Sequence, residues 1–342
     1  MTTHKVIIGN SNFLSNITDE SVDLIVTSPP YPMIEMWDAI WDTTTKELLY
    51  SGNGYEAFIH MHNILNSVWE ECDRVLKSGG FVCINIGDAT RTIDSNFQLY
   101  PNHAKVIEYF SAMGYSVLPD IHWRKQTNSP NKFMGSGMYP AGAYVTYEHE
   151  YILIFRKGGK RTFSGREKEL RQKSAYFWEE RNVWFSDLWD IKGIGQTIAA
   201  SKPTRSRNAS YPLEIPYRLI NMYSVEGDTI LDPFFGMGTT GIAAMISNRN
   251  SIGVEIDSDV AELALDAMDI TVDSCNQYIM ERLLRHIEFI NSLPNEKRAK
   301  LYHNIPHGFD VKTRQEIAIH IEQLKSIEWI DTGYVCKYEG DY

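Results

Sequence analysis

A serine and a tyrosine on either side of two prolines, Ser28-Pro29-Pro30-Tyr31, form the stretch of the chain best suited to chemistry. They follow Val22–Val26, a short apolar run rich in β-branched residues, which predicts a buried strand. The prolines must end that strand, because neither can donate a hydrogen bond to a neighbouring strand and each keeps the residue before it extended. The pattern predicts a stiff loop that presents the Ser28 hydroxyl, backbone carbonyls and the Tyr31 ring. Open α/β sheets bind ligands at the edge where such a loop lies.

A second loop with the features of a ligand site follows another apolar run. Thr229–Leu231 leads into Asp232-Pro233-Phe234-Phe235-Gly236-Met237-Gly238-Thr239-Thr240-Gly241, and a helical pattern comes next. Glycines at 236 and 238 let backbone N–H groups approach a ligand, and a helix that begins near Thr239 adds a partial positive field. NAD is one ligand that such a glycine loop could bind. The G-x-G-x-x-G spacing occurs here only after Asp-Pro-Phe, however, and dinucleotide sites lack that tripeptide.

Together these stretches resemble the amino-group DNA methyltransferases that use S-adenosyl-L-methionine. The first resembles their catalytic S/D/N-P-P-Y motif, and the second resembles their D-P-F-x-G-x-G-T-T cofactor loop. The catalytic motif comes first, which is the order of the family's β group, in which the stretch between the motifs carries target recognition. The resemblance covers about residues 4–257. It implies a Rossmann-like α/β fold with a mostly parallel seven-stranded sheet and a circularly permuted motif order.

The resemblance assigns catalysis to Ser28, Pro29, Pro30 and Tyr31. The exocyclic amine of cytosine or adenine is a poor nucleophile because its lone pair is delocalised into the ring. The Ser28 hydroxyl and the Pro29 carbonyl could accept its N–H bonds and free that lone pair, while positioning supplies much of the remaining rate. Tyr31 would stack on the base once it is flipped out of the duplex. This chemistry demands no metal, and the sequence holds no His/Cys cluster with metal-ligand spacing.

The cofactor pocket is also assigned by resemblance. The family places the acidic residue of D-P-F, here Asp232, near the amino group of the cofactor. Phe234 or Phe235 would pack near its adenine or methionine, while the other phenylalanine joins the core. Glu255 ends the apolar run Ser251–Glu255 about 20 residues after the glycine loop, where an acidic side chain can accept both ribose hydroxyls.

The chain departs from the family pattern at two places around this pocket. Asn10 follows Gly9 where the family often has Gly-Asp, and Pro212 is present without the usual histidine. The predicted cofactor-binding residues are Asp232, Phe234, Phe235, Gly236, Gly238, Thr239, Thr240, Glu255, Asn10 and Pro212.

The methylated base is predicted from the first residue of the catalytic motif. In this family S-P-P-Y is commoner in enzymes acting on cytosine N4, whereas D-P-P-Y and N-P-P-Y are commoner in those acting on adenine N6. Cytosine C5 methylation is excluded because it needs a cysteine nucleophile, typically in a Pro-Cys dipeptide, which this sequence lacks. We expect methylation of cytosine N4 in double-stranded DNA, within a restriction–modification system and without direct contact to the endonuclease. Adenine N6, RNA as the substrate, and a DNA-binding protein without turnover are the alternatives.

The elements that must position these residues alternate between strands and helices, as in a mostly parallel sheet. Apolar runs predict strands at Val6–Ile8, Asp23–Val26, Phe81–Ile86, Tyr115–Trp123, Tyr151–Phe155, Thr229–Leu231 and Ser251–Glu255. Helical spacing predicts helices at Tyr55–Lys77, Pro101–Met113, Tyr211–Tyr223 and Thr239–Ile246, and it dominates from Val260 onward. Residues 125–144 carry no periodicity and predict a long loop.

Charge is distributed unevenly along the 342 residues, of which 43% are hydrophobic and 23% charged, an ordinary globular composition. The net charge of −11 argues against a general polyanion binder. Residues 156–207 nevertheless hold 13 Lys+Arg against 6 Asp+Glu, which leaves −18 on the remainder. This basic window suits DNA docked on one face. Its candidate DNA contacts are Arg161, Arg166, Lys202, Arg205 and Arg207.

We expect four segments in the chain. Residues 1–157 form the catalytic half, 158–210 a target-recognition insert, 211–257 the half that binds S-adenosyl-L-methionine, and 258–342 a helical extension that closes a core or a dimer. The four scattered cysteines indicate reduced thiols. No apolar run approaches the roughly 20 residues that span a bilayer, and the start lacks the pattern of a signal peptide. The sequence predicts a cytoplasmic monomer or homodimer with no membrane partner.

Overall fold

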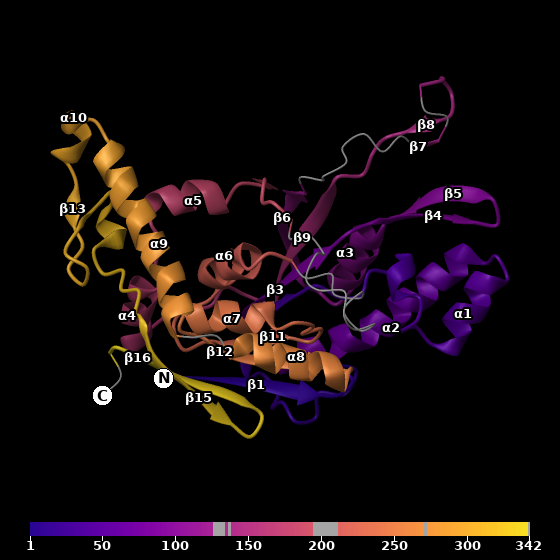
Figure 1. The fold of residues 1–342 in the computed structure, drawn as a ribbon, viewed down its shortest axis with the longest axis horizontal. Helices are drawn as coiled ribbons and strands as arrows, with labels where there is room; N and C mark the ends of the chain where they lie inside the picture. Colours follow the sequence, from indigo (N-terminus) through magenta and orange to yellow (C-terminus); the bar gives the residue numbers. More distant parts are fainter. Residues whose placement is uncertain (126–133, 136–137, 194–210, 270–271, 341–342) are drawn as a thin grey trace.

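Five neighbouring parallel strands form the centre of the fold (Figure 1). The structure is a computed structural model that describes residues 1–125, 134–135, 138–193, 211–269 and 272–340. The main sheet contains β1 (Thr2–Ile8), β2 (Val22–Thr27), β3 (Leu76–Ile86), β6 (Ser116–Arg124), β9 (His149–Arg156), β10 (Leu188–Trp189), β11 (Thr229–Asp232), β12 (Asn250–Glu255), β15 (Leu324–Ile330) and β16 (Gly333–Tyr338). Their order is β10-β6-β9-β3-β2-β11-β12-β1-β16-β15. Strands β3, β2, β11, β12 and β1 run parallel, so their carboxyl ends share one edge, here called the carboxyl edge.

Helices cover both faces of this sheet (Figure 1). One hydrophobic cluster is formed with α2 (Gly54–Val75) and α3 (Asn102–Ala112), and the other with α6 (Glu214–Tyr223), α7 (Thr239–Ile246), α8 (Ser258–Met268) and α9 (Val272–Ser292). The remaining helical elements are η1 (Glu35–Trp37), α1 (Thr43–Tyr50), α4 (Arg166–Lys173), α5 (Trp178–Trp184), α10 (Asn295–Arg298) and η3 (Arg314–Glu316). The small hairpins pair β4 (Ala89–Ile93) with β5 (Asn96–Tyr100), β7 (Met134–Gly135) with β8 (Ala143–Tyr144), and β13 (Tyr302–His303) with β14 (Asp310–Val311).

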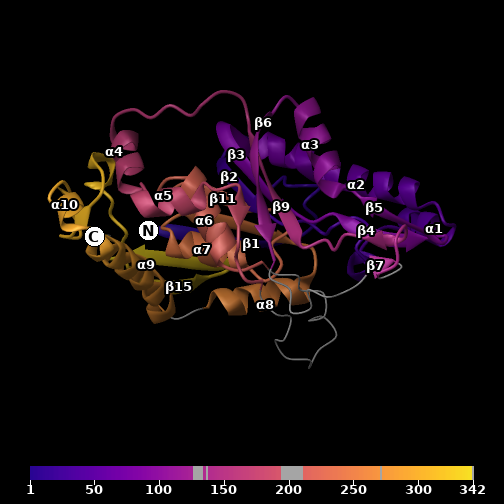
Figure 2. The same ribbon diagram turned by 90° about the horizontal axis from the view of Figure 1, so that it is seen from above.

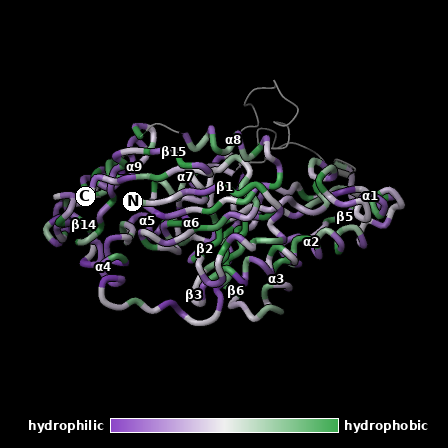
Figure 3. Tube along the Cα trace, turned by 90° about the horizontal axis from the view of Figure 1, so that it is seen from below, coloured by the Kyte–Doolittle hydropathy of each residue, from purple (hydrophilic) through white to green (hydrophobic). Residues whose placement is uncertain are grey.

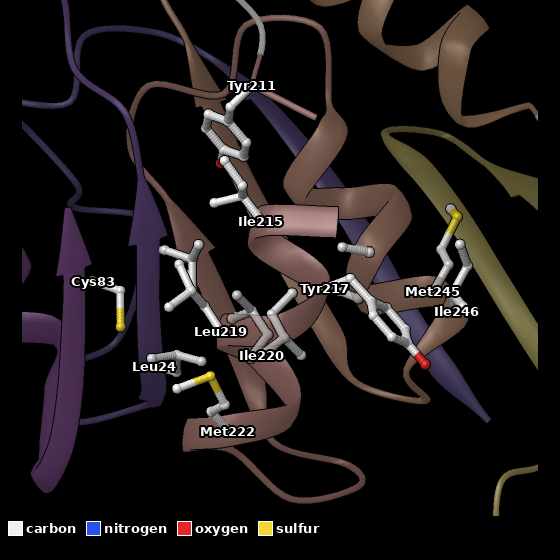
Figure 4. Packing of buried hydrophobic residues seen from close by; sticks show 14 of the residues in the cluster. Leu24, Cys83, Tyr211, Ile215, Tyr217, Leu219, Ile220, Met222, Met245 and Ile246 are labelled. Carbon is white, nitrogen blue, oxygen red and sulfur yellow. The ribbon is translucent and has the colours of Figure 1, made fainter. Parts of the chain in front are cut away.

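Strand β2 shows why the centre of the sheet is apolar. All six of its residues are buried. Leu24 belongs to the cluster of α6, where Leu219 and Met222 lie close to it (Figure 4), whereas Ile25 belongs to the cluster of α2. A parallel strand with helices on both sides has no solvated face, so its sequence does not alternate with polar residues. Figure 3 accordingly shows the hydrophobic stretches along β2 and β3 and a hydrophilic α4.

The predicted α/β fold with a large, mostly parallel sheet is confirmed, and the seven predicted strands are β1, β2, β3, β6, β9, β11 and β12. The predicted strand number is wrong, because β10 extends one side of the sheet and β16 and β15 extend the other. The C-terminal extension is therefore not wholly helical. In β16 the buried Tyr334, Cys336 and Tyr338 alternate with half-buried residues, a period of two that is short enough to be missed beside long helices.

The C-terminal extension packs against the segment that precedes the cofactor half. Figure 1 and Figure 2 both show α9 and α10 near α4 and α5, at the end of the molecule opposite α1. Arg282 of α9, with its side chain only 4% exposed, donates to the Glu180 carboxylate at 2.6 Å. His286 Nδ1 lies 2.6 Å from Glu179 Oε1, and its ring stacks on Phe177. Within the described ranges, no helix is long and apolar enough to cross a membrane.

Removing Arg282 tests how strongly the extension holds the α5 segment. Arg282→Met removes the buried cation from the half-buried Glu180 carboxylate, so we expect the free energy of unfolding to fall by about 3–5 kcal/mol. Urea denaturation followed by circular dichroism measures it. Arg285→Met on the exposed face of the same helix is the control, expected to change stability by less than about 0.5 kcal/mol. Equal losses of unfolding free energy in the two variants would show that the Arg282–Glu180 ion pair does not stabilise the fold.

Gly253 of β12 leaves room for the ring of Phe235 because it has no side chain. A Cβ atom at 253 would lie 2.2 Å from Phe235 Cγ. We expect Gly253→Ala to lower the free energy of unfolding by about 1–3 kcal/mol, because the ring must move within a packed core. Gly159→Ala, where a Cβ meets nothing within 4 Å, should cause no loss. Thermal denaturation of both variants measures the difference, and an unaffected Gly253→Ala protein would contradict this packing.

Candidate active site

The two loops that the sequence singles out meet in one cavity at the carboxyl edge. Strands β2 and β11 are neighbours in the sheet, so the loops that follow them leave side by side. The cavity has a volume of about 680 Å³. The predicted residues that line it are Asn10, Ser28, Pro29, Pro30, Tyr31, Asp232, Phe234, Phe235, Gly236, Thr239, Thr240 and Glu255. Gly238 and Pro212 lie outside the lining, although Tyr211, the neighbour of Pro212, is part of it.

The glycine loop takes the backbone path that its glycines permit. Gly236 has φ +52° and Gly238 has φ +78°, a left-handed region that other residues rarely adopt. Gly238 precedes the first residue of α7 as its N-cap, so free N–H groups of that helix end face the loop. The Gly236 N–H donates to Glu255 at 2.9 Å. The loop can therefore present backbone donors to a ligand, with an acidic group beside them.

Asp232 is the buried centre of the cofactor half. Its carboxylate accepts hydrogen bonds from the Thr27 hydroxyl at 2.6 Å and the Thr240 hydroxyl at 2.6 Å. It also accepts the Phe234 N–H at 3.1 Å. Burial raises the pKa of Asp232 to about 6, although these donors oppose the shift. The Tyr211 hydroxyl lies 2.5 Å from Thr240 Oγ1, which extends the network to the segment before α6.

Glu255 is partly exposed at the cavity, and each of its oxygens already accepts one backbone N–H. Oε2 accepts from Gly236 at 2.9 Å and Oε1 accepts from Asp257 at 3.0 Å. A carboxylate has about four acceptor sites, so two remain for donors on a ligand, as a vicinal diol would supply. This fixed orientation fits the role that the sequence predicts.

The two phenylalanines of the loop have different surroundings. Phe235 is only 3% exposed and packs against Gly253 and Gly241, so it belongs to the core. Phe234 is half-buried and meets the Trp69 ring edge-on at a centroid distance of 5.8 Å. Both contact the cavity, and Phe234 offers the more accessible ring.

Two residues that the sequence did not point to, Asn85 on β3 and Glu150 on β9, form hydrogen bonds with the catalytic loop. The Tyr31 hydroxyl donates to Glu150 at 2.9 Å and accepts from Asn85 at 2.7 Å. Ser28 Oγ lies 3.1 Å from the Tyr31 oxygen. Lys125 pairs with the same carboxylate. A polar residue inside the apolar run Phe81–Ile86 was the available signal for Asn85, because a buried polar group needs partners.

Of the predicted DNA contacts, the two that the structure describes, Arg161 and Arg166, do not line this cavity. Arg161 pairs with Asp228 at 2.7 Å and lies 3.6 Å from Asp23, at the amino ends of β11 and β2 and thus at the opposite edge of the sheet. Its charge is already used inside the protein, so the structure does not support Arg161 as a DNA contact. Arg166 is exposed at the start of α4. Lys202, Arg205 and Arg207 lie outside the described residues.

A larger hollow of about 1390 Å³ lies at the opposite edge of the sheet, and its lining includes Asp23, Arg161 and Phe163. Neither predicted loop contributes to it. It is walled by the segments around α4 and α5, and its arginines Arg161 and Arg171 both lie over the Phe163 ring. The candidate active site is therefore the smaller cavity at the carboxyl edge.

Comparison with known proteins agrees with this geometry. A family model described as DNA methylase (N6/N4) matches residues 22–266. The type II methyltransferase M.MthZI of Methanothermobacter thermautotrophicus is 50% identical over 326 residues, which cover 94% of this chain and 90% of that protein. M.MjaI of Methanocaldococcus jannaschii, also a type II methyltransferase, is 48% identical over 287 residues, with 79% and 92% covered.

The fold is shared with a solved structure as well. TTHA0409 from Thermus thermophilus, a putative DNA modification methylase solved in complex with S-adenosyl-L-methionine, aligns with a TM-score of 0.60 and 31% identity over 78% of this chain and 94% of that chain. The matched region of the family model contains both loops of the cavity. The chain therefore belongs to the N6/N4 family of DNA methylases.

Proposed function

We propose that this DNA methyltransferase transfers the methyl group of S-adenosyl-L-methionine to the exocyclic N4 of a cytosine flipped out of duplex DNA. The observation that carries the proposal is the meeting of the S-P-P-Y loop and the D-P-F-x-G-x-G-T-T loop in one cavity. Cytosine is favoured over adenine by Ser28 as the first residue of the catalytic motif. Adenine N6 is the second candidate, because the same acceptors suit either exocyclic amine.

The cavity fits the cofactor in several respects. The left-handed turns at Gly236 and Gly238 bring the amino end of α7, with Thr239 and Thr240, to the cavity wall. Glu255 keeps two acceptor sites for ribose hydroxyls. Asp232 provides a carboxylate for an amino group, and Phe234 a partly exposed ring for packing. When bound, the cofactor supplies a methyl group on positively charged sulfur. The Thermus relative with this cofactor in its structure supports the assignment.

The catalytic loop would act on the amine through acceptors and stacking. The Ser28 hydroxyl and the Pro29 carbonyl accept its hydrogens, so that its lone pair turns toward the methyl group. The Tyr31 ring stacks on the base while its hydroxyl stays hydrogen-bonded to Glu150. Gly87 packs closely against this ring. A Cβ atom at 87 would lie 3.1 Å from the ring, so the glycine there helps to set its position.

We further propose that the substrate is duplex DNA and that the enzyme acts within a restriction–modification system. Relatives named type II methyltransferases support that role. We retain residues 158–210 as the proposed target-recognition insert, between the proposed catalytic half, 1–157, and cofactor half, 211–257. Lys202, Arg205 and Arg207 remain predicted DNA contacts within this insert.

The first test identifies the methylated nucleoside. The protein is incubated with labelled S-adenosyl-L-methionine and unmethylated genomic DNA, and the DNA is digested to nucleosides. We expect the label in N4-methylcytosine, and none with Ser28→Ala, which should still bind the cofactor because Ser28 is assigned to the base. Label in N6-methyladenine would overturn the choice of base while the enzyme class stands.

Cofactor affinity should depend on pH through Asp232. Burial raises its pKa to about 6, so the carboxyl is largely neutral below that pH and charged above it. An ammonium group of the ligand needs the charged form, so we expect affinity to rise with pH, by up to about tenfold per unit below pH 6, and then to level off. Isothermal titration calorimetry between pH 5 and 8 measures it. Asp232→Asn should bind weakly with no such dependence, and a flat wild-type profile would contradict this role.

A further inference from the structure

The hydrogen bonds beneath the catalytic loop form a chain that leads from the cavity into the protein. Ser28 Oγ lies 3.1 Å from the Tyr31 oxygen, and the Tyr31 hydroxyl donates to Glu150 Oε2 at 2.9 Å. Asn85 Nδ2 donates to that same carboxylate oxygen and to the Tyr31 oxygen, both at 2.7 Å. Ser28 and Tyr31 line the cavity, whereas Asn85 and Glu150 do not and are only 3% and 8% exposed.

The carboxylate fixes the direction of every bond in this chain. A carboxylate can only accept, so the single hydrogen of the Tyr31 hydroxyl is committed to Glu150. The two amide hydrogens of Asn85 are committed to Glu150 and Tyr31. The reverse amide orientation would set the Asn85 oxygen against the carboxylate, which has no hydrogen to give. The hydrogen between Ser28 and Tyr31 must therefore be that of Ser28.

This direction leaves Ser28 as an acceptor toward the cavity. Its hydrogen points back to Tyr31, so both remaining interactions of its oxygen are lone pairs. An amine placed above Ser28 would thus meet an acceptor and not a competing donor. The orientation of the Ser28 hydroxyl hydrogen is therefore determined by Glu150, which acts through Tyr31 without contacting the serine.

We infer that Ser28, Tyr31 and Glu150 form a proton relay that takes up the proton released when the exocyclic amine is methylated. Methyl transfer forms an N–C bond while the carbon–sulfur bond of the methyl donor breaks and the sulfur keeps that electron pair. The amine nitrogen is left positively charged, so one N–H bond must break while the nitrogen keeps the electron pair. That proton passes to Ser28 Oγ as the serine proton passes to the Tyr31 oxygen and the tyrosine proton to Glu150. The carboxylate becomes a carboxylic acid, while serine and tyrosine end neutral as they began. The inference rests on the proposed function only through an exocyclic amine, which cytosine and adenine share.

The surroundings of the relay suit this task. Burial and the Glu150 carboxylate raise the pKa of Tyr31 well above its usual range, so the phenol keeps a proton and hands one on only as it receives another. Lys125 pairs with the second oxygen of Glu150. The proton thus moves from the reacting atom to an ion pair shielded from the cavity, without a base that faces the cofactor.

The test separates the tyrosine hydroxyl from its ring. Tyr31→Phe keeps the ring that stacks on the base and removes the relay, and Glu150→Gln removes the acceptor at the end. Glu148→Gln is the matched control, because Glu148 lies beside the same strand end and, within the described part of the chain, its side chain has a single ion-pair contact, 3.9 Å from Arg124. The rate of one turnover is measured by mixing the enzyme–cofactor complex with duplex DNA. Cofactor affinity is measured by calorimetry, and flipping by the fluorescence of a 2-aminopurine at the target position.

We expect Tyr31→Phe and Glu150→Gln each to slow the single turnover by about 10²–10⁴-fold, with cofactor affinity and the flipping signal unchanged. The double variant should be no slower than the slower single variant, because a relay acts as one unit. Glu148→Gln should match the wild type.

Three results would overturn the relay. The first is a wild-type rate in Tyr31→Phe. The second is a loss of flipping or cofactor binding that accounts for the slower rate, because the residues would then only shape the pocket. The third is multiplicative losses in the double variant. An active wild type that yields N6-methyladenine would refute the proposed base and leave the relay standing, whereas a wild type inactive on DNA would refute both.

Discussion

The hydrogen bond from Thr27 to Asp232 joins the two halves of the site, and the rest of the structure depends on it. Thr27 ends the strand that leads to the S-P-P-Y loop, and Asp232 begins the glycine loop 205 residues later in the chain. Both groups are almost fully buried, so the bond lies where water cannot replace it and a lost partner would be costly. Parallel pairing of β2 with β11 brings the two residues together, and the hydroxyl–carboxylate bond then fixes their distance.

Much of this plan could be predicted from the sequence because its signals are local. Each of the seven predicted strands is an apolar run with turn residues at its end, and each loop carries its function within a few neighbouring residues. The dipeptide Pro29-Pro30 fixes its own backbone, and the left-handed turns at Gly236 and Gly238 require the residue type that stands there. Such features need no knowledge of distant partners.

The remaining features depend on pairings that no local pattern encodes. Glu150 meets Tyr31 only because β9 runs antiparallel to β3 and so begins at the carboxyl edge. The charge of Arg161 counts toward a basic window in the sequence, yet Asp23 and Asp228 neutralise it in the fold. Sheet edges were missed for a related reason: β10 has two residues, too few to show a period. Long-range order of this kind becomes visible only once the strands are arranged.

The position of β1 has a consequence for biosynthesis. This strand leaves the ribosome before the other strands of the main sheet, but its two neighbours there are β12 and β16, so that His4 pairs with Ser251 on one side and Tyr334 on the other. At about 5–20 residues per second, the nascent chain must hold this strand unpaired for roughly tens of seconds. An unpaired strand invites association with other chains. Lys5, exposed in the middle of β1, places a charge on that strand while it lacks its partners, and chaperones that shield extended segments would be expected to bind it before β12 and β16 are made.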